Sequence, residues 1–212
     1  MHVDAQAGPI GGVSAIVLAA GRGSRFGGGK LLALHRGHPV LYHVMAAAAA
    51  AASAGWLTRI IGVVPAGATT LSGLVTESGG RVVIQPDLDA AMASSLRLGL
   101  DAAAGAHAAL ILLGDQPLVS PGTIGLLVAA HHDTPDAVIR PRYDADPDQP
   151  GHPVIVPSRW WPLLRGDEGD QGFGALLDDA IPRIELPVPG HNPDIDTPAD
   201  LERLATVKVS ES

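Results

Sequence analysis

The chain has 212 residues, which is enough for one substantial α/β domain and short for two. Its net charge of −8 argues against nucleic acid or an anionic membrane as the main partner, because both attract a basic protein surface. The absence of cysteine excludes disulfides and thiolate metal sites.

Most of the chain alternates between short apolar runs, typical of buried strands, and longer segments that are typical of helices. This alternation predicts a parallel, doubly wound sheet with helices on both faces, and the most apolar run, residues 108–113, should be central. Strands are predicted at 15–20, 59–64, 81–85 and 108–113, and helices at 40–57, up to about 78, at 90–104 and at 121–131.

The last part of the chain is less regular. Residues 141–150 are rich in proline and aspartate and predict a long exposed loop. A short strand at 154–156, a turn and helix at 169–179, a strand at 184–188 and a closing helix from 198 to about 205 should follow. We expect a three-layer α/β/α, Rossmann-like fold with a mostly parallel sheet and one antiparallel strand near the C-terminal half. The expected organisation is a flexible lead-in at 1–13, a single domain at 14–206 and a tail at 207–212.

No segment predicts export or membrane insertion. The first fourteen residues lack the basic and apolar regions of a signal peptide. Residues 40–57 are long and apolar, but the alanine run at 46–52 makes them only weakly hydrophobic, so a packed helix is the better interpretation. We therefore expect a soluble, cytoplasmic protein.

The stretch that predicts chemistry is residues 15–30, AIVLAAGRGSRFGGGK. A buried strand ends there in a glycine-rich loop whose N–H groups can surround phosphate oxygens, while Arg25 and Lys30 add positive charge. Spacing excludes two common phosphate-binding motifs. The dinucleotide fingerprint needs glycine where Phe26 stands, and the P-loop needs glycine in place of Ser24. The alternative is a βα turn that binds nothing, which would make poor use of so many glycines and cations.

In an open parallel sheet, ligands bind beyond the carboxyl ends of the strands, which selects the loops after 15–20, 81–85 and 108–113 as walls of one site. Asp115 follows the last of these strands in the motif GDQP. It suits Mg²⁺, which takes one or two protein carboxylates together with phosphate oxygens and water. The alternative is a turn aspartate that caps the helix beginning at Pro121.

A second acidic cluster lies at 194–201, DIDTPADL. Alternation puts Asp194 and Asp196 on one side of an extended segment, where a bound cation would explain their proximity. The alternative is charge compensation at the N-terminus of the closing helix, which Asp200 fits well. Five histidines have no metal-ligand spacing and are interpreted as structural: His35, His38, His107, His131 and His132.

The glycine loop at 18–32 and the two acidic motifs resemble those of nucleotidyltransferases that move a nucleoside monophosphate from a nucleoside triphosphate. The most similar group is the molybdenum cofactor cytidylyltransferases, and the resemblance covers about residues 14–205. It implies a nucleotidyltransferase domain in which Asp115 and Asp196 hold Mg²⁺, with Asp194 as a weaker candidate. The implied catalytic residues are Arg25, Lys30 and Asp115.

The resemblance also implies which residues bind the nucleotide. Residues 87–100 are similar to the family's GM-SSL segment, although Ala91 stands where glycine is usual. Gln85 stands where asparagine is expected, and its amide could meet a base edge. Ala19 and Ala20 resemble the CTP-using branch, whereas the GTP-using relatives carry a glycine pair. The implied nucleotide-binding residues are Ala19, Ala20, Gly21, Gly23, Arg25, Lys30, Gln85, Ser94 and Ser95.

Residues 151–154, GHPV, and 169–172, GDQG, match segments that this group uses near its acceptor substrate. By resemblance, His152 donates to an acceptor phosphate, and Asp170 orients a pterin or another residue. The alternative for His152 is a histidine in a turn. The family usually continues to an arginine where this chain has Gly174, so a bidentate anion contact is missing and the acceptor stays open.

The resemblance implies Mg²⁺-dependent transfer of CMP from CTP to the terminal phosphate of a molybdopterin-type cofactor, with release of pyrophosphate. It further implies a molybdoenzyme or its maturation factor as a partner. Two other functions stay open: a GTP-using guanylyltransferase or sugar-phosphate nucleotidyltransferase, and a non-catalytic nucleotide-binding accessory protein. Pyrophosphate release would separate an enzyme from an accessory protein.

Overall fold

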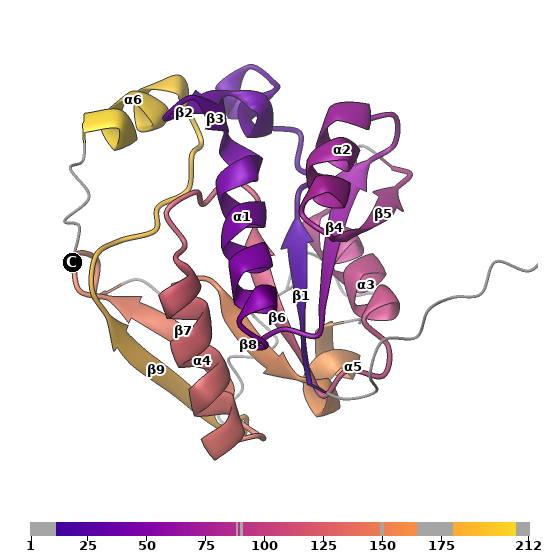
Figure 1. Ribbon diagram of the computed structural model, residues 1–212, viewed down its shortest axis with the longest axis vertical. Coiled ribbons are helices and arrows are strands. Elements are labelled where there is room, and N and C mark those ends of the chain that lie inside the picture. The colour runs from indigo at the N-terminus through magenta and orange to yellow at the C-terminus, as the bar shows by residue number, and fades with distance from the viewer. Residues whose placement is uncertain (1–11, 88, 90, 149–150, 165–179, 207–212) are drawn as a thin grey trace, which may run out of the picture.

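The computed structural model describes residues 12–87, 89, 91–148, 151–164 and 180–206. Its centre is a seven-stranded sheet in the order β5-β4-β1-β6-β8-β7-β9 (Figure 1). The strands are β1 (Val13–Leu18), β4 (Arg59–Pro65), β5 (Arg81–Gln85), β6 (Ala108–Leu113), β7 (Val138–Tyr143), β8 (Val154–Pro157) and β9 (Arg183–Val188).

Six of the seven strands run in the same direction. β1 pairs in parallel with β4 and β6, so that Ile16 lies opposite Ile61 on one side and Ile111 on the other. β4 pairs in parallel with β5, and β7 with β9. β8 is antiparallel to both β6 and β7. The predicted mostly parallel sheet with one antiparallel strand is therefore confirmed, and β6 occupies the predicted centre.

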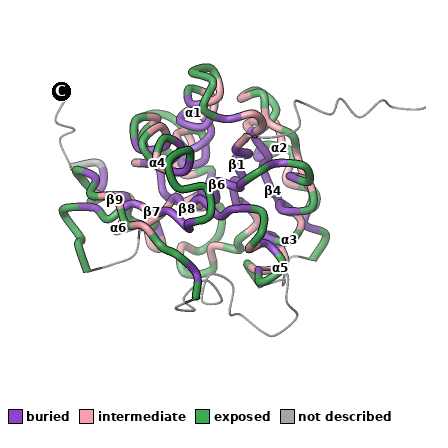
Figure 2. Tube along the Cα trace, turned by 90° about the horizontal axis from the view of Figure 1, so that it is seen from below, coloured by how far each residue is buried: buried purple, intermediate pink, exposed green. Residues whose placement is uncertain are grey.

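Helices cover both faces of the sheet, which makes three layers (Figure 1). Strand alternation divides the core: Val17 of β1 packs with the helices of one face, while Ile16 packs with those of the other. Figure 2 shows the central strands, such as β1 and β6, buried between these helices. One face carries α1 (Val40–Ser53), α2 (Thr69–Glu77) and α4 (Pro121–Asp133), and the other carries α3 (Met92–Ala102) and α5 (Trp161–Leu164).

The remaining elements are short and lie near the ends of the sheet. A hairpin of β2 (Leu34–His35) and β3 (His38–Pro39) contacts the closing helix α6 (Pro198–Thr206). Within the described part of the chain, no helix has both the length and the hydrophobicity that crossing a membrane requires. The described residues also form three 3₁₀ turns: η1 (Ser24–Phe26), η2 (Lys30–Leu32) and η3 (Ser158–Trp160).

The predicted loop at 141–150 is wrong at its start, because β7 extends to Tyr143. Proline lacks the N–H that a strand donates, and no strand was predicted around Pro141. Pro141 instead pairs with Leu186 of β9, whereas β7 pairs with β8 two residues earlier, at Ile139. The proline thus lies beyond the part of β7 that pairs with β8. The helix predicted at 169–179 lies outside the described residues.

Ser120 caps α4, as its sequence predicts. Its Oγ accepts a hydrogen bond from the N–H of Thr123 at 3.0 Å, and Pro121 occupies the first turn. We expect Ser120→Ala to lower the free energy of unfolding by about 1 kcal/mol, because one N–H of the first turn loses its partner. Urea denaturation would measure the change. Ser53→Ala, at the exposed end of α1, is the matched control and should change stability by less than about 0.5 kcal/mol.

Candidate nucleotidyl-transfer site

The glycine loop leaves β1 at the carboxyl edge of the sheet and returns through η2. Gly29, with φ of 70°, is the residue before η2 and adopts a left-handed conformation that favours glycine. At Gly23 there is little space for a side chain, because a Cβ there would lie 3.1 Å from Cγ of Lys30. The loop therefore folds back against the aliphatic stem of Lys30. The ammonium group of Lys30 is directed at the carboxylates of Asp115 and Asp196.

Lys30 and Arg25 bring the two predicted metal ligands together. The Lys30 ammonium donates to Oδ2 of Asp115 and lies 3.5 Å from Oδ1 of Asp196. Arg25 donates to Oδ2 of Asp196 at 3.0 Å. The side chain of Lys30 is 11% exposed and that of Asp115 is 21% exposed, so their ion pair is largely shielded from water, whereas Arg25 is exposed. Four residues separated by up to 171 positions thus form one charged cluster.

Backbone contacts hold the two acidic segments in place. The N–H of Ile195 donates to the carbonyl of Asp115 at 3.0 Å, which ties the segment before α6 to the end of β6. At the start of α6, Thr197 and Asp200 form reciprocal hydrogen bonds of the capping-box kind. A hydrogen bond from the Thr197 hydroxyl, and then the one from its N–H, lower the pKa of Asp200. Asp200 therefore caps the helix, whereas Asp196 remains directed at the cations.

A cavity of about 310 Å³ lies against this cluster. It joins the loop after β1, the start of α3 after β5 and the loop after β6, as the rule for parallel sheets predicts. Of the predicted nucleotide-binding residues, Ala20, Gly21, Lys30 and Ser95 line it. The other described lining residues are Leu18, Leu31, Met92, Leu113, Asp115, Asp194 and Asp196.

Gln85 lies behind this cavity. Its side chain is 3% exposed, and Nε2 donates to Oγ of Ser94 at 3.1 Å and of Ser95 at 3.2 Å. Its Oε1 accepts from the N–H of Asp87 at 3.2 Å. The amide is thus engaged within the protein and orients the first turn of α3, instead of being presented to a base. Ala19 is also buried, and Gly23 and Arg25 belong to the loop next to the cavity.

A second, larger cavity of about 660 Å³ adjoins the first, and Leu113 and Asp194 line both. His152, which the resemblance assigns to the acceptor, lies on its wall. Burial lowers the pKa of His152 to about 4, so the ring is neutral near pH 7. Burial also raises the pKa of Asp194, and the charges of Asp115 and Asp196 add to that effect. The predicted acceptor residue Asp170 lies outside the described residues.

Sequence reasoning assigned no role to five polar residues on the wall of the second cavity: Gln116, Tyr143, Asp146, His191 and Asn192. Gln116 donates to Asp194 at 2.8 Å and accepts from Asn192 at 3.1 Å. Tyr143 donates to the carbonyl of His152 at 2.9 Å, and burial raises the pKa of this tyrosine to about 12. Gln116 lies next to Asp115 in the GDQP motif, and this adjacency was the one available signal.

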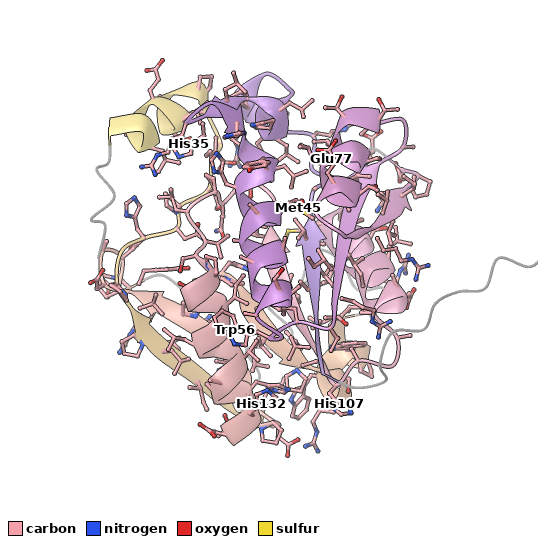
Figure 3. The ribbon with its side chains drawn as sticks, viewed as in Figure 1. His35, Met45, Trp56, Glu77, His107 and His132 are labelled. Carbon is pink, nitrogen blue, oxygen red and sulfur yellow. The ribbon has the colours of Figure 1, made fainter. Side chains whose placement is uncertain are left out.

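The donor set fits a divalent cation that also binds a nucleotide. Asp115 and Asp196 contact the same ammonium group, so their carboxylates are close enough to share a cation. Mg²⁺ needs no more than one or two such carboxylates when phosphates and water complete its shell. The described residues contain no group of three or more histidine, aspartate or glutamate side chains arranged as a metal site. Figure 3 shows His107 and His132 at the opposite end of the sheet from the glycine loop.

Comparisons with known proteins identify the family of the chain. The model of the MobA-like NTP transferase domain matches residues 15–184. Nicotine blue oxidoreductase of Paenarthrobacter nicotinovorans is 28% identical over 91% of this chain and 96% of its own. A 2-C-methyl-D-erythritol 4-phosphate cytidylyltransferase of Cereibacter sphaeroides is 36% identical over 58% of this chain and 56% of its own.

Solved structures show the same fold. Rv0371c from Mycobacterium tuberculosis superposes with a TM-score of 0.78 and 28% identity, covering 94% of this chain and all of that chain. A structure of Rv0371c in complex with manganese has a TM-score of 0.75 and 26% identity, and covers 94% of this chain and all of that chain. The predicted fold class and the resemblance to nucleotidyltransferases are both confirmed. The chain belongs to the MobA-like NTP transferase family and is a nucleotidyltransferase.

Proposed function

We propose that the protein transfers CMP from CTP to the terminal phosphate of a molybdopterin-type cofactor and releases pyrophosphate, with Mg²⁺ as its metal ion. The observation that carries this proposal is the contact of one ammonium group, that of Lys30, with both Asp115 and Asp196 at the end of a glycine loop. This contact joins a loop suited to a triphosphate to a pair of carboxylates suited to a divalent cation.

The chain's own groups would act by positioning and by charge. The N–H groups of the loop at 21–29 would hold the triphosphate, and Lys30 and Arg25 would stabilise the charge that develops as the α-phosphate is transferred. Asp115 and Asp196 would hold the metal, which when bound neutralises charge on the phosphate oxygens. Because the acceptor phosphate itself attacks, no protein nucleophile is needed.

Two features support the choice of CTP. Ala19 and Ala20 precede the glycine loop, as in the CTP-using branch that the sequence resembles. The relative that is 36% identical over 58% of the chain is a cytidylyltransferase. The structure of Rv0371c in complex with manganese supports a divalent metal ion in this protein as well. The second cavity, with His152 on its wall, would take the acceptor, and Asp170 would orient it.

The long similarity to nicotine blue oxidoreductase makes a redox activity the second candidate. The chain has no cysteine, so such an activity would need a bound redox cofactor. Pyrophosphate release from CTP in the presence of molybdopterin would favour nucleotidyl transfer. Turnover of an electron acceptor without pyrophosphate release would favour the oxidoreductase.

We expect CTP to raise the melting temperature of the protein more than GTP, ATP or UTP does, and Mg²⁺ to increase the effect. A ligand at 100 times its Kd adds about 2.7 kcal/mol, which is a shift of several degrees for a domain of this size. Differential scanning fluorimetry with each nucleotide, with and without Mg²⁺, measures this. A GTP-selective shift would support a guanylyltransferase, and no shift with any nucleotide would contradict the proposed function.

A further inference from the structure

The buried amide of Gln85, behind the nucleotide cavity, has its orientation set by the backbone. Gln85 is the last residue of β5, and the N–H of Asp87 donates to one end of its amide at 3.2 Å. Because a backbone N–H can only donate, that end of the amide is the oxygen Oε1. The opposite end, which faces the first turn of α3, is therefore the NH₂ group.

The NH₂ group of Gln85 sets the direction of two serine hydroxyls. Nε2 donates to Oγ of Ser94 at 3.1 Å and to Oγ of Ser95 at 3.2 Å. A hydroxyl has one proton and two positions at which it accepts. Since each hydroxyl accepts from the amide, its own proton must point away from Gln85. No hydrogen bond to a described residue uses either proton, so both can serve a ligand.

Of the two serines, Ser95 lines the nucleotide cavity. Met92, the first residue of α3, lines it as well. No side chain caps the start of this helix, so its first N–H groups add partial positive charge to the same wall. A hydroxyl proton beside the positive end of a helix favours an oxygen atom of the ligand.

We propose that Gln85 is a positioning residue, which holds the Ser95 hydroxyl so that it donates to an oxygen of the bound nucleotide. This oxygen belongs to a phosphate, to the ribose or to the base. The inference rests on the proposed function, since it requires a nucleotide in this cavity. A hydroxyl that is oriented in advance loses little rotational freedom when the ligand binds, so Gln85 raises the affinity without touching the nucleotide.

Gln85→Glu tests the inference, because it keeps the shape of the side chain and replaces the NH₂ group with a second acceptor oxygen. Both hydroxyls would then donate to the carboxylate, and the nucleotide would lose the Ser95 proton. Isothermal titration calorimetry with CTP and Mg²⁺ should show at least about tenfold weaker binding. Ser95→Ala should weaken binding by about tenfold for the same reason.

Ser72→Ala is the matched control. Ser72 is the fourth residue of α2, as Ser95 is the fourth residue of α3, and its hydroxyl donates to the carbonyl of Ala68 at 3.0 Å. The same hydroxyl is removed from the same helical position, away from the nucleotide cavity. The affinity for CTP should remain that of the native protein.

The double variant Gln85→Glu/Ser95→Ala separates positioning from repulsion between the new carboxylate and the nucleotide. If Gln85 acts through Ser95, Ser95→Ala should cost less than about twofold in the Gln85→Glu protein, because the proton is already lost there. Losses that multiply, to about 100-fold in the double variant, would show that the two residues act independently. That result, or native affinity in Gln85→Glu, would overturn the inference.

Gln85→Met carries the test if the melting curve shows that Gln85→Glu does not fold. Methionine removes the hydrogen bonds without adding charge, and the Ser95 hydroxyl is then free to turn. Binding should weaken by about threefold, which is the cost of ordering one side chain again. Native affinity in a folded Gln85→Met protein would overturn the inference.

Titration of Ser95→Ala with tripolyphosphate and Mg²⁺ identifies the oxygen. Weaker binding of both tripolyphosphate and CTP supports a contact with a phosphate, whereas weaker binding of CTP alone supports one with the ribose or the base. If the native protein binds GTP instead of CTP, the same variants are titrated with GTP, and only the choice of CTP fails. If the native protein binds no nucleotide, the proposed function fails and the inference with it. Nucleotide binding with multiplying losses overturns the inference alone.

Discussion

Replacing Asp115 with asparagine is expected to lower kcat for pyrophosphate release by at least about 100-fold, with little effect on folding. The substitution keeps the shape of the side chain but removes the charge that faces Lys30 and that would hold the metal. Loss of one preorganised electrostatic group of this kind typically costs about 10²–10³ in kcat. Because the side chain is 21% exposed and the contact with Ile195 uses the backbone carbonyl of Asp115, the fold should survive.

The measurement is steady-state pyrophosphate release from CTP with molybdopterin as the acceptor, together with a melting curve for each protein. Asp133→Asn is the matched control, since it makes the same change on an exposed residue at the end of α4. It should retain native kcat. If Asp115→Asn keeps more than about a tenth of native turnover, Asp115 is not a metal ligand in the reaction, because a lost ligand costs more.

The position of this aspartate was predictable because it depends on local patterns. A run of six apolar residues, 108–113, indicates a buried strand, and the rule for parallel sheets then places Asp115 at the same edge as the glycine loop. Neither step requires knowledge of which side chains meet. The same reasoning predicted β1, β4 and β5, and it selected the loops after β1, β5 and β6 as walls of one site.

What could not be predicted depends on contacts distant in the sequence. Asn192 reaches Gln116 across 76 positions, and no local pattern marks either as a partner. The insertion of β8 between β6 and β7 is similar, because β6 and β8 are adjacent in the sheet but not consecutive in the chain. Pro141 further hid β7, since a proline usually ends a strand and here lies beyond the part that pairs with β8.

Lys30→Met is expected to lower kcat by about 10²–10³ and, in addition, to change how the protein binds metal. In the structure the Lys30 ammonium contacts both Asp115 and Asp196 and so neutralises part of their charge. A divalent ion that arrives without nucleotide must compete with this cation. A triphosphate would draw the ammonium toward its own oxygens and leave the carboxylates to the metal, so we expect nucleotide and metal to bind together.

Methionine keeps a long, flexible side chain but removes the charge, so Asp115 and Asp196 would repel each other in the variant. Stability should fall by about 1–3 kcal/mol, less than for a fully buried pair, because both carboxylates are partly exposed. A divalent ion relieves the repulsion. Titration with Mn²⁺, followed by electron paramagnetic resonance of the free ion, should therefore show tighter nucleotide-free binding in Lys30→Met than in the native protein.

Lys30→Arg is the matched control for this experiment, because it keeps a cation beside Asp115 and Asp196 and should keep nucleotide-free Mn²⁺ binding weak. Its turnover should still fall, since a planar guanidinium does not replace a compact ammonium group at a crowded phosphate. If Mn²⁺ binds the native protein and Lys30→Met equally well without nucleotide, Lys30 does not compete with the metal. The two carboxylates would then hold their ion independently of the triphosphate, and the coupling between the two ligands would have to arise from the phosphates alone.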